Sequence, residues 1–500
     1  MLRNIGSNWV LTAVTIVATY FLTPFIIRTL GQDGYGTWTL ITAMTGYMSL
    51  LALGVPMACV RYLAQHVTEG DSQKTNDVIG SCIGLYLMIG AAVIVLGLAL
   101  TAGLTVVYDI PPALQTPARF ACALMVVQVA AGFIGLLPEG IMFAHHDFVA
   151  RNIVRVASVV LRLGLTLGLL SLQPSLVVLA AVQLATLAFD FSASLVLIRR
   201  RYPDVRLRLR DFEWATVRRI FSFSMYVLLL AAGARLSFET DALVIGAVLG
   251  VSAIPFYAVA NSLVVYLMDF TIAIAAVVAP MATKLETEGR REELTAMFLK
   301  WSKISLSLTL MAGLFLIVLG PRFIGWWIAP EFEQPSGVVL EILMVSCFAF
   351  LPVRGVALPL LLGLGKPRIP TIAFLAAGIL NLILSLVLAR PFGLAGVAVG
   401  TAIPNLLFAA VVLVVACREL HISLGAYLTY VVPRAALGAL PPLALLMWFK
   451  VGVGVHTLPG LIGAGIAMVT LFGITAMLFV YRGDPYVDFT PRRLRGWSRA

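Results

Sequence analysis

Apolar segments of about 18 or more residues recur from one end of the chain to the other. Each is long enough to cross about 30 Å of hydrocarbon as an α-helix. Of the 500 residues, 60% are hydrophobic and only 12% are charged, whereas charged residues make up about 25% of an ordinary soluble domain. The sequence therefore predicts an all-α, polytopic membrane protein.

The positive charges predict the topology. We expect fourteen spans, with limits near 8–28, 37–60, 79–107, 118–144, 152–171, 175–198, 220–249, 253–282, 303–328, 337–362, 369–389, 394–417, 431–449 and 459–481. With these limits, 26 of the 35 lysines and arginines lie on one side, five on the other and four within spans. Because cytoplasmic loops are enriched in lysine and arginine, both termini are expected in the cytoplasm and the protein in the inner (cytoplasmic) membrane.

The absence of several known motifs disfavours some classes of function. The sequence has no Walker A stretch and no nucleotide-binding domain, so ATP is not expected as the energy source. The histidines form no metal-binding pattern and no loop carries a convincing acid/base constellation, so we expect no metal, no cofactor and no catalytic residue. We interpret the basic loop 199–219 as a topology anchor that meets anionic lipid headgroups, rather than as a nucleic-acid site.

The cysteines are scattered singly through apolar runs. They are Cys59, Cys82, Cys122, Cys347 and Cys417. No pair has the spacing of zinc ligands, and the pattern is not that of a disulfide framework. We therefore expect small, buried, apolar side chains that form no disulfide.

An internal repeat divides the chain. A shift of 219 residues, without gaps, superposes four landmarks: Gly31 on Gly250, Gly70 on Gly289, His146 on Gly365 and Arg162 on Asn381. This predicts a lobe at 1–198 and a second lobe at 220–417, each of six helices, joined by the loop 199–219. Two further helices at 418–481 and a basic cytoplasmic tail at 482–500 follow. Parallel repeats of this kind place a substrate site at the repeat interface.

The segment "RTLGQDGYGTWTLITAMTGYMSLLALGVPMACVRYLA" contains Leu30-Gly31, Tyr35-Gly36, Gly54 and Arg61. It resembles the first hairpin of the polysaccharide-transporter (Wzx-type flippase) branch of the multidrug/oligosaccharidyl-lipid/polysaccharide exporter superfamily. The segment "GILNLILSLVLARPFGLAGVAVGTAI" is similar to the eleventh and twelfth spans of that family, through Asn381 and the Gly393–Gly396 turn. The resemblance implies two six-helix lobes around a central cavity, two extra helices, and a polyprenyl-pyrophosphate-linked oligosaccharide as substrate.

Charged residues within the spans are the candidate site. Charges inside a membrane are tolerated where they face a wet cavity or pair with one another. Four arginines are the candidates for binding a pyrophosphate, because the guanidinium fork binds phosphate oxygens bidentately: Arg155, Arg162, Arg235 and Arg354. Three acids are the candidates for cation-coupled gating: Glu239, Asp241 and Asp269. The alternative for each residue is a structural ion pair, and Arg235 and Glu239 lie four residues apart on one helix face.

The function predicted from these features is a flippase of lipid-linked oligosaccharides for surface polysaccharide biosynthesis, working by alternating access without ATP. Its expected partners are the lipid-linked oligosaccharide and membrane lipids, with a polysaccharide polymerase or glycosyltransferases as candidate assembly partners. The main alternative is a cation-coupled multidrug or metabolite antiporter of the same superfamily, which would favour carboxylates in the cavity. A non-transporting scaffold and an integral-membrane transferase are further alternatives.

The charge asymmetry gives a testable topology. Cysteines introduced in place of Gln173 and Ser252 should react with an impermeant thiol reagent applied to intact cells, because both positions lie on the side poor in lysine and arginine. A cysteine in place of Arg208 should react only after the membrane is opened. Labelling of position 208 in intact cells would contradict the fourteen-span topology with both termini inside.

Overall fold

A computed structural model describes residues 2–52, 55–209, 212–214, 217 and 225–487. Gly54, parts of the predicted basic loop (210–211, 215–216 and 218–219) and residues 488–500 of the predicted tail lie outside these ranges. No β-strand occurs in the described ranges, which confirms the predicted all-α fold class. The chain forms two compact units. Unit 1 contains Met1–Arg235 and Glu239–Pro255, and unit 2 contains Leu236–Phe238 and Phe256–Ala500.

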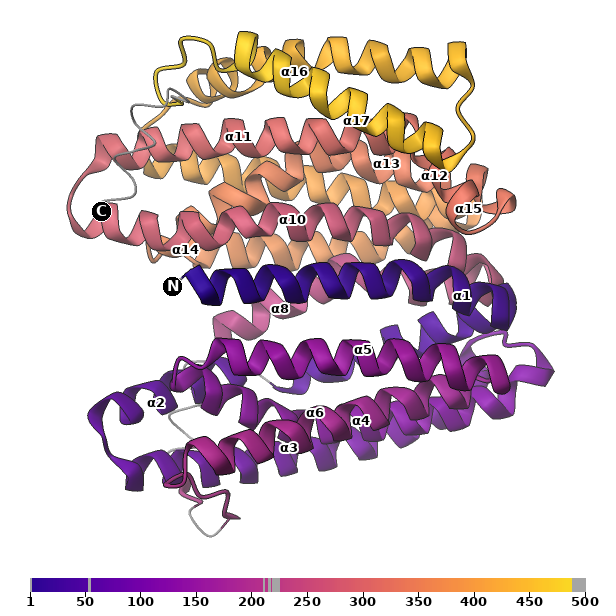
Figure 1. Ribbon diagram of the computed structural model, residues 1–500, viewed down its shortest axis with the longest axis vertical. Helices are drawn as coiled ribbons and strands as arrows, with labels where there is room; N and C mark the ends of the chain where they lie inside the picture. Colours follow the sequence, from indigo (N-terminus) through magenta and orange to yellow (C-terminus); the bar gives the residue numbers. More distant parts are fainter. Residues whose placement is uncertain (1, 53–54, 210–211, 215–216, 218–224, 488–500) are drawn as a thin grey trace. The chain divides into compact units, whose positions relative to one another are not determined.

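Unit 1 is a bundle of long helices joined by short turns. Its elements are α1 (Leu2–Met48), η1 (Ser49–Ala52), α2 (Val55–Glu69), α3 (Ser72–Val107), α4 (Pro112–Ala144), α5 (Phe148–Leu172), α6 (Leu176–Arg201), most of α8 (Met225–Phe238), α9 (Thr240–Val248) and η3 (Val251–Ala253). Helix α4 packs against both α3 and α6, and α5 packs against α1 and α6 (Figure 1). Polar side chains cap two of these helices at their N-termini, Asp71 for α3 and Ser175 for α6.

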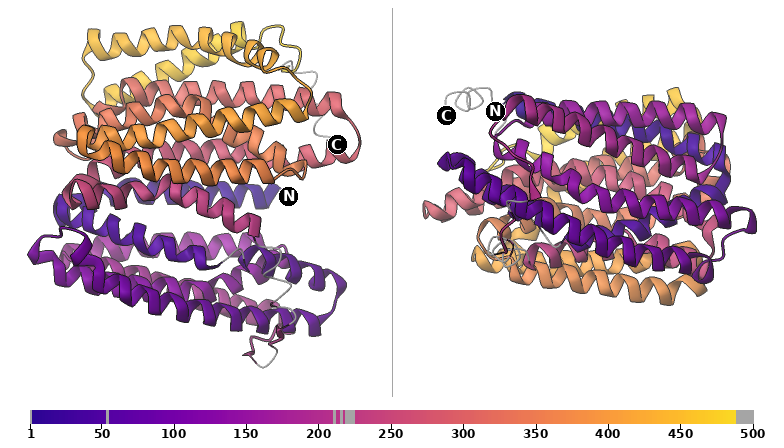
Figure 2. Two further views of the ribbon diagram at one scale, coloured as in Figure 1. Left: turned by 180° about the vertical axis from the view of Figure 1, so that it is seen from behind. Right: turned by 90° about the horizontal axis from the view of Figure 1, so that it is seen from below.

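Unit 2 is a second bundle. Its elements are the last three residues of α8, all but the first two residues of α10 (Ile254–Thr287), α11 (Arg291–Val318), α12 (Gly320–Trp327), η4 (Pro330–Phe332), α13 (Glu333–Pro352), the π-helix η5 (Val353–Ala357), α14 (Leu358–Gly363), α15 (Arg368–Glu419), α16 (Leu424–Met447), the π-helix η6 (Trp448–Val453), α17 (Leu458–Thr475) and the π-helix η7 (Ala476–Val480). Helix α13 packs against α11 and α15, and α16 packs against α11 and α17 (Figure 2).

The described residues include 11 helical segments that are long and apolar enough to cross a membrane. Two of them, α1 with 47 residues and α15 with 52, contain a glycine with non-helical backbone, Gly31 and Gly393. The backbone of α15 reverses at Gly393, and a hydrogen bond from Asn381 before it to Thr401 after it shows that the two parts lie side by side. Each of these two long helices can therefore contain two of the predicted spans. The described part of the predicted seventh span instead forms two short helices, α8 and α9. The number fourteen stays a prediction.

The repeat is visible in the backbone. Gly31 and Gly250, Gly70 and Gly289, and His146 and Gly365 are pairs 219 residues apart, and every member has positive φ. The hydrogen bonds match as well. The Gly70 N–H bonds to Val67 O at 3.2 Å, and the Gly289 N–H bonds to Glu286 O at 3.0 Å. A left-handed residue that ends a helix in this way is a Schellman-type cap.

The third pair repeats the same cap. The His146 N–H bonds to Phe143 O at 3.0 Å, and the Gly365 N–H bonds to Leu362 O at 3.1 Å. Three pairs of positive-φ residues at one constant offset, two of them with matching helix caps, support the register of the predicted repeat. The exact limits of the two predicted lobes, 1–198 and 220–417, stay a prediction.

One sequence-based expectation is wrong. Cys59 on α2 and Cys82 on α3 form a disulfide, with their Cα atoms 6.8 Å apart. The turn after Glu69 folds α3 back along α2, and this brings two cysteines 23 residues apart within bonding reach. The other three cysteines are buried free thiols, as expected.

Candidate functional site

The N-terminal half of α5 holds a network of ion pairs within unit 1. Arg151, whose side chain is only 4% exposed, donates to Asp190 on α6 at 2.8 Å and to Glu139 on α4 at 3.1 Å. Glu139 also accepts from Arg155 at 3.1 Å, and Ser158 donates to Asp190 at 3.3 Å. Because a buried cation needs compensation, the two acids are explained as counter-ions that tie α4, α5 and α6 together.

Arg155, a predicted phosphate ligand, belongs to this network. Its guanidinium is paired with Glu139, and its side chain is 47% exposed. An exposed ion pair is weak and is easily exchanged for another partner. Arg155 thus remains available to an anion only in competition with Glu139.

Arg235 is paired as its spacing predicts. It forms an ion pair with Glu239, four residues later, and donates to Ser49 at 3.1 Å. The hydroxyl of Tyr47 donates to the carbonyl of Arg235 at 3.1 Å. All of these residues belong to unit 1. Gly46 leaves the room for this cluster, because a Cβ there would lie 2.8 Å from Oε2 of Glu239.

The helix is interrupted where these charges lie. Helix α8 ends at Phe238 and α9 begins at Thr240, so Glu239 stands at the break. Asp241 follows in the first turn of α9, where the helix dipole favours an acid, and it is 2% exposed. The segment thus accommodates its charges by pairing, by a broken helix and by a helix N-terminus.

Arg162 and Arg354 are different, because neither forms an ion pair within the described part of the chain. Their Nε atoms are buried and have no hydrogen-bond partner there. Arg162 lies in the middle of α5. Arg354 lies in the π-helix η5, with its guanidinium carbon 4.9 Å from the centre of the Phe374 ring. π-Helical turns are rare and occur frequently at functional sites.

Asp269 is the acid that stands out. It lies midway along α10, it is exposed, and it has no ion-pair partner among the described residues. An unpaired carboxylate at membrane depth is tolerated where it meets water or a ligand. The charged candidates are therefore of two kinds: Arg155, Arg235 and Glu239 are paired, whereas Arg162, Arg354 and Asp269 have no charged partner in the described residues.

Asn381 is a buried structural residue. It is fully buried in unit 2, where its Nδ2 donates to Thr401 at 3.0 Å and to the carbonyl of Ser237 at 3.3 Å. Its partner in the repeat is Arg162, so one position carries a neutral amide in unit 2 and a cation in unit 1.

Sequence reasoning missed a second buried ion pair. Lys303 on α11 forms an ion pair with Asp484, and their side chains are 1% and 0% exposed. The hydroxyl of Tyr430 on α16 donates to the same carboxylate at 2.6 Å, and the Lys303 ammonium lies 4.6 Å from the centre of its ring. Lys303 and Asp484 were not among the predicted candidates, because they lie at or just beyond the ends of predicted spans. The cluster joins α11, α16 and the segment after α17.

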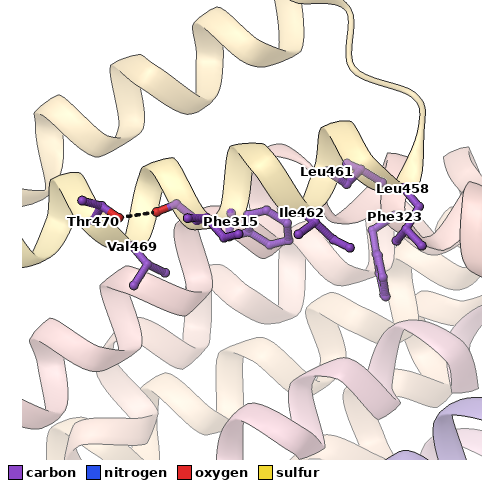
Figure 3. A pocket seen from close by; sticks show the side chains of 9 residues that line it. Phe315, Phe323, Leu458, Leu461, Ile462, Val469 and Thr470 are labelled. Carbon is purple, nitrogen blue, oxygen red and sulfur yellow. Dashed lines mark hydrogen bonds between the residues drawn. The ribbon is translucent and has the colours of Figure 1, made fainter.

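A pocket of about 420 Å³ lies between α11, α12 and α17 (Figure 3). Its lining is apolar apart from Thr470, whose hydroxyl donates to the carbonyl of Ile466 at 2.8 Å. Phe315 on α11 and Phe323 on α12 line it together with Leu461 and Ile462 on α17. Without a charged or free polar group, this pocket has no means of fixing an anionic headgroup.

The fold defines the class of protein. It is similar to the solved structure of the lipid II flippase MurJ in an inward closed conformation, with a TM-score of 0.75 and 11% identity over 97% of this chain and 99% of that one. It is also similar to an inward-facing multidrug resistance MATE family transporter of the MOP superfamily, with a TM-score of 0.69 and 16% identity over 82% and 98% of the chains. The chain therefore has the fold of the exporter superfamily.

The sequence comparisons define the family. Residues 1–286 match the family described as "Polysaccharide biosynthesis protein", and the chain belongs to this family. It is 24% identical over 497 residues to the "Uncharacterized membrane protein EpsK" of Bacillus subtilis, covering 95% of both chains. It is 21% identical over 391 residues to the "Putative O-antigen transporter" of Shigella flexneri, covering 76% and 88%. The predicted membership of the polysaccharide-transporter branch is confirmed.

The buried Lys303–Asp484 pair gives a stability test. Replacing Lys303 with Met leaves the Asp484 carboxylate buried without a countercharge, which should cost about 3–5 kcal/mol in the free energy of unfolding. The double variant Lys303→Met, Asp484→Leu should recover most of the loss, because no charge is left unpaired. Thermal unfolding of purified protein in detergent measures both.

The matched control is Lys366→Met, which breaks the exposed pair of Lys366 with Glu419. Such surface pairs contribute about 0–1 kcal/mol, so the midpoint should hardly move. Equal losses for the two single variants would contradict a special role of the buried cluster.

Proposed function

We propose that this protein is a flippase that moves a polyprenyl-pyrophosphate-linked oligosaccharide across the cytoplasmic membrane by alternating access, without ATP. The observation that carries the proposal is the presence of two arginines, Arg162 and Arg354, that lie within helices and have no acidic partner in the described residues. A cation in such a place is costly unless an anion or water compensates it. A pyrophosphate supplies that anion, and guanidinium binds its oxygens bidentately.

The family and its relatives support a carbohydrate cargo. The family description refers to polysaccharide biosynthesis, and one relative is named for O-antigen transport.

Arg162 and Arg354 are the proposed headgroup ligands. Arg155 is a weaker candidate because Glu139 competes for it, and Arg235 is proposed to stabilise the break between α8 and α9 together with Glu239. Asp241 and Asp269 remain candidates for coupling. The inner membrane, both termini in the cytoplasm, and assembly with a polymerase or glycosyltransferases belong to the same proposal.

Single substitutions test the proposed ligands. Arg162→Ala and Arg354→Ala should each lower flipping about 10- to 100-fold, the range expected for losing hydrogen bonds to a charged group. Arg→Lys should retain part of the activity, because an ammonium keeps the charge but loses the planar fork. The assay follows a short polyprenyl-pyrophosphate-linked oligosaccharide in ATP-free proteoliposomes with matched protein levels.

Two controls accompany the arginine variants. Arg290→Ala removes an exposed arginine outside the helices and should leave flipping unchanged. Circular dichroism and the unfolding midpoint show whether each variant is folded. Full flipping by folded Arg162→Ala and Arg354→Ala variants would exclude both residues as headgroup ligands.

One observation favours the second candidate function, a cation-coupled antiporter: the exposed Asp269 has no ion-pair partner among the described residues. If this carboxylate carries the coupling proton, Asp269→Asn should abolish the response of transport to a pH gradient, since an amide cannot be protonated near neutral pH. Binding of the transported compound should survive. Glu239→Gln is the matched comparison, because Glu239 already neutralises Arg235. A normal pH response in the Asp269→Asn variant would exclude this role.

A further inference from the structure

The segment that follows α6 is fastened to the end of unit 1. We call its described residues, 202–209 and 212–214, the strap. Asn76 on α3 donates to the carbonyl of Asp204 at 3.1 Å and accepts from the Arg206 N–H at 2.7 Å. Ser81 on α3 accepts from the Glu213 N–H at 3.0 Å and donates to the Glu213 carbonyl at 3.3 Å. Two side chains of one helix thus bind the strap backbone at two places.

The start of the strap is held by charge. Arg201 and Tyr202 both donate to the carboxylate of Asp147, which precedes α5, and the Tyr202 distance is 2.9 Å. The His145 ring stacks on Tyr202 with centroids 4.0 Å apart. Burial tends to raise the pKa of Asp147, but the hydrogen bonds from Arg201 and Tyr202 outweigh burial and lower it. The carboxylate is therefore ionised at neutral pH and holds the strap in place.

The strap has an inward and an outward side. Val205 and Leu207 pack against the hydrophobic core of unit 1. Phe212 lies over Gly84, where a Cβ would come within 2.5 Å of its ring. Because side chains alternate along an extended segment, Arg206 and Arg208 face away from the core and are exposed.

The exposed surface of the strap combines basic and large apolar residues. Leu209 is 52% exposed, although its Cδ1 would lie 3.5 Å from a Cβ on Gly84, and Trp214 is 64% exposed. Arg199 and Arg200 are exposed at the end of α6. The strap lies where apolar helices end, which is the level of the membrane–water interface. Tryptophan side chains are enriched at this interface, where they lie close to the lipid phosphates.

We propose that the strap is a docking surface for anionic phospholipids. Arg206 and Arg208 would contact the phosphates of the bilayer surface while Leu209 and Trp214 enter the headgroup layer. Charge complementarity selects this occupant, because a polybasic segment gains about fivefold in affinity for an anionic membrane with each arginine near the surface. The fixed backbone keeps both arginines on one side, so they act together. This inference does not depend on the transported substrate.

A cysteine in place of Leu209 tests the proposal in the full-length protein. The protein is placed in nanodiscs of phosphatidylcholine alone, or of phosphatidylcholine mixed with phosphatidylglycerol, and its reaction rate with an uncharged, water-soluble maleimide is measured. Phosphatidylglycerol should slow the reaction by about 25-fold, the product of about fivefold for each of two arginines. High salt should restore the rate, because it screens exposed charges.

Matched variants separate the strap from general effects of the lipid. Arg206→Gln with Arg208→Gln should abolish the slowing, whereas Arg290→Gln with Arg291→Gln, which removes two charges elsewhere, should preserve it. A cysteine in place of the exposed Thr68 on α2 should react at the same rate in both lipids. Equal rates at position 209 in the two lipids, or slowing that survives Arg206→Gln with Arg208→Gln, would overturn the proposal.

The hydrogen bonds that fasten the strap to α3 can be tested separately. Asn76→Ala with Ser81→Ala removes the four hydrogen bonds between α3 and the strap, so amide hydrogen exchange of residues 204–209 and 212–213 should accelerate. The lipid-dependent slowing at position 209 should then weaken, because the two arginines are no longer held on one side. Unchanged exchange in this variant would refute a fastened strap.

Discussion

A charge surrounded by hydrocarbon has to be paired, hydrated or bound to a ligand. In unit 1 this constraint explains why Arg151 lies between two acids and why Arg235 has Glu239 one turn away. In unit 2 it explains the burial of Lys303 with Asp484. Once these pairs are assigned, the cations that remain are the informative ones. Arg162 and Arg354 become candidates for ligand binding because no acid among the described residues explains their presence.

Sequence periodicity predicted the helical membrane fold well, because the bilayer sets the length of each apolar segment. The repeat was also predictable, since glycines at turns with positive φ leave a trace in the sequence. Gly31, Gly70 and their partners all have that backbone. Span counting was less certain where a helix reverses within a short turn, as at Gly393, or breaks beside charges, as at Glu239.

The site could be predicted only in part. The spacing of Arg235 and Glu239 is local, so their pairing follows from sequence. The pairing of Arg155 with Glu139 joins two helices, and that of Lys303 with Asp484 joins α11 to the segment after α17, so no periodicity encodes either pair. The disulfide between Cys59 and Cys82 was missed for the same reason, because it depends on how α2 and α3 meet. The π-helix around Arg354 has no recognisable sequence signal.

The turn at His146 and its counterpart at Gly365 have the same helix-cap geometry in the two copies of the repeat. A histidine accepts the same left-handed backbone that a glycine adopts 219 residues later, with equivalent hydrogen bonds. The helix ends are therefore held to one geometry while the side chains diverge. At the paired positions 162 and 381, one copy has a permanent cation and the other a neutral amide. The two halves thus share a backbone geometry at these turns but are not electrostatically equivalent, so a single anion would meet a different field in each.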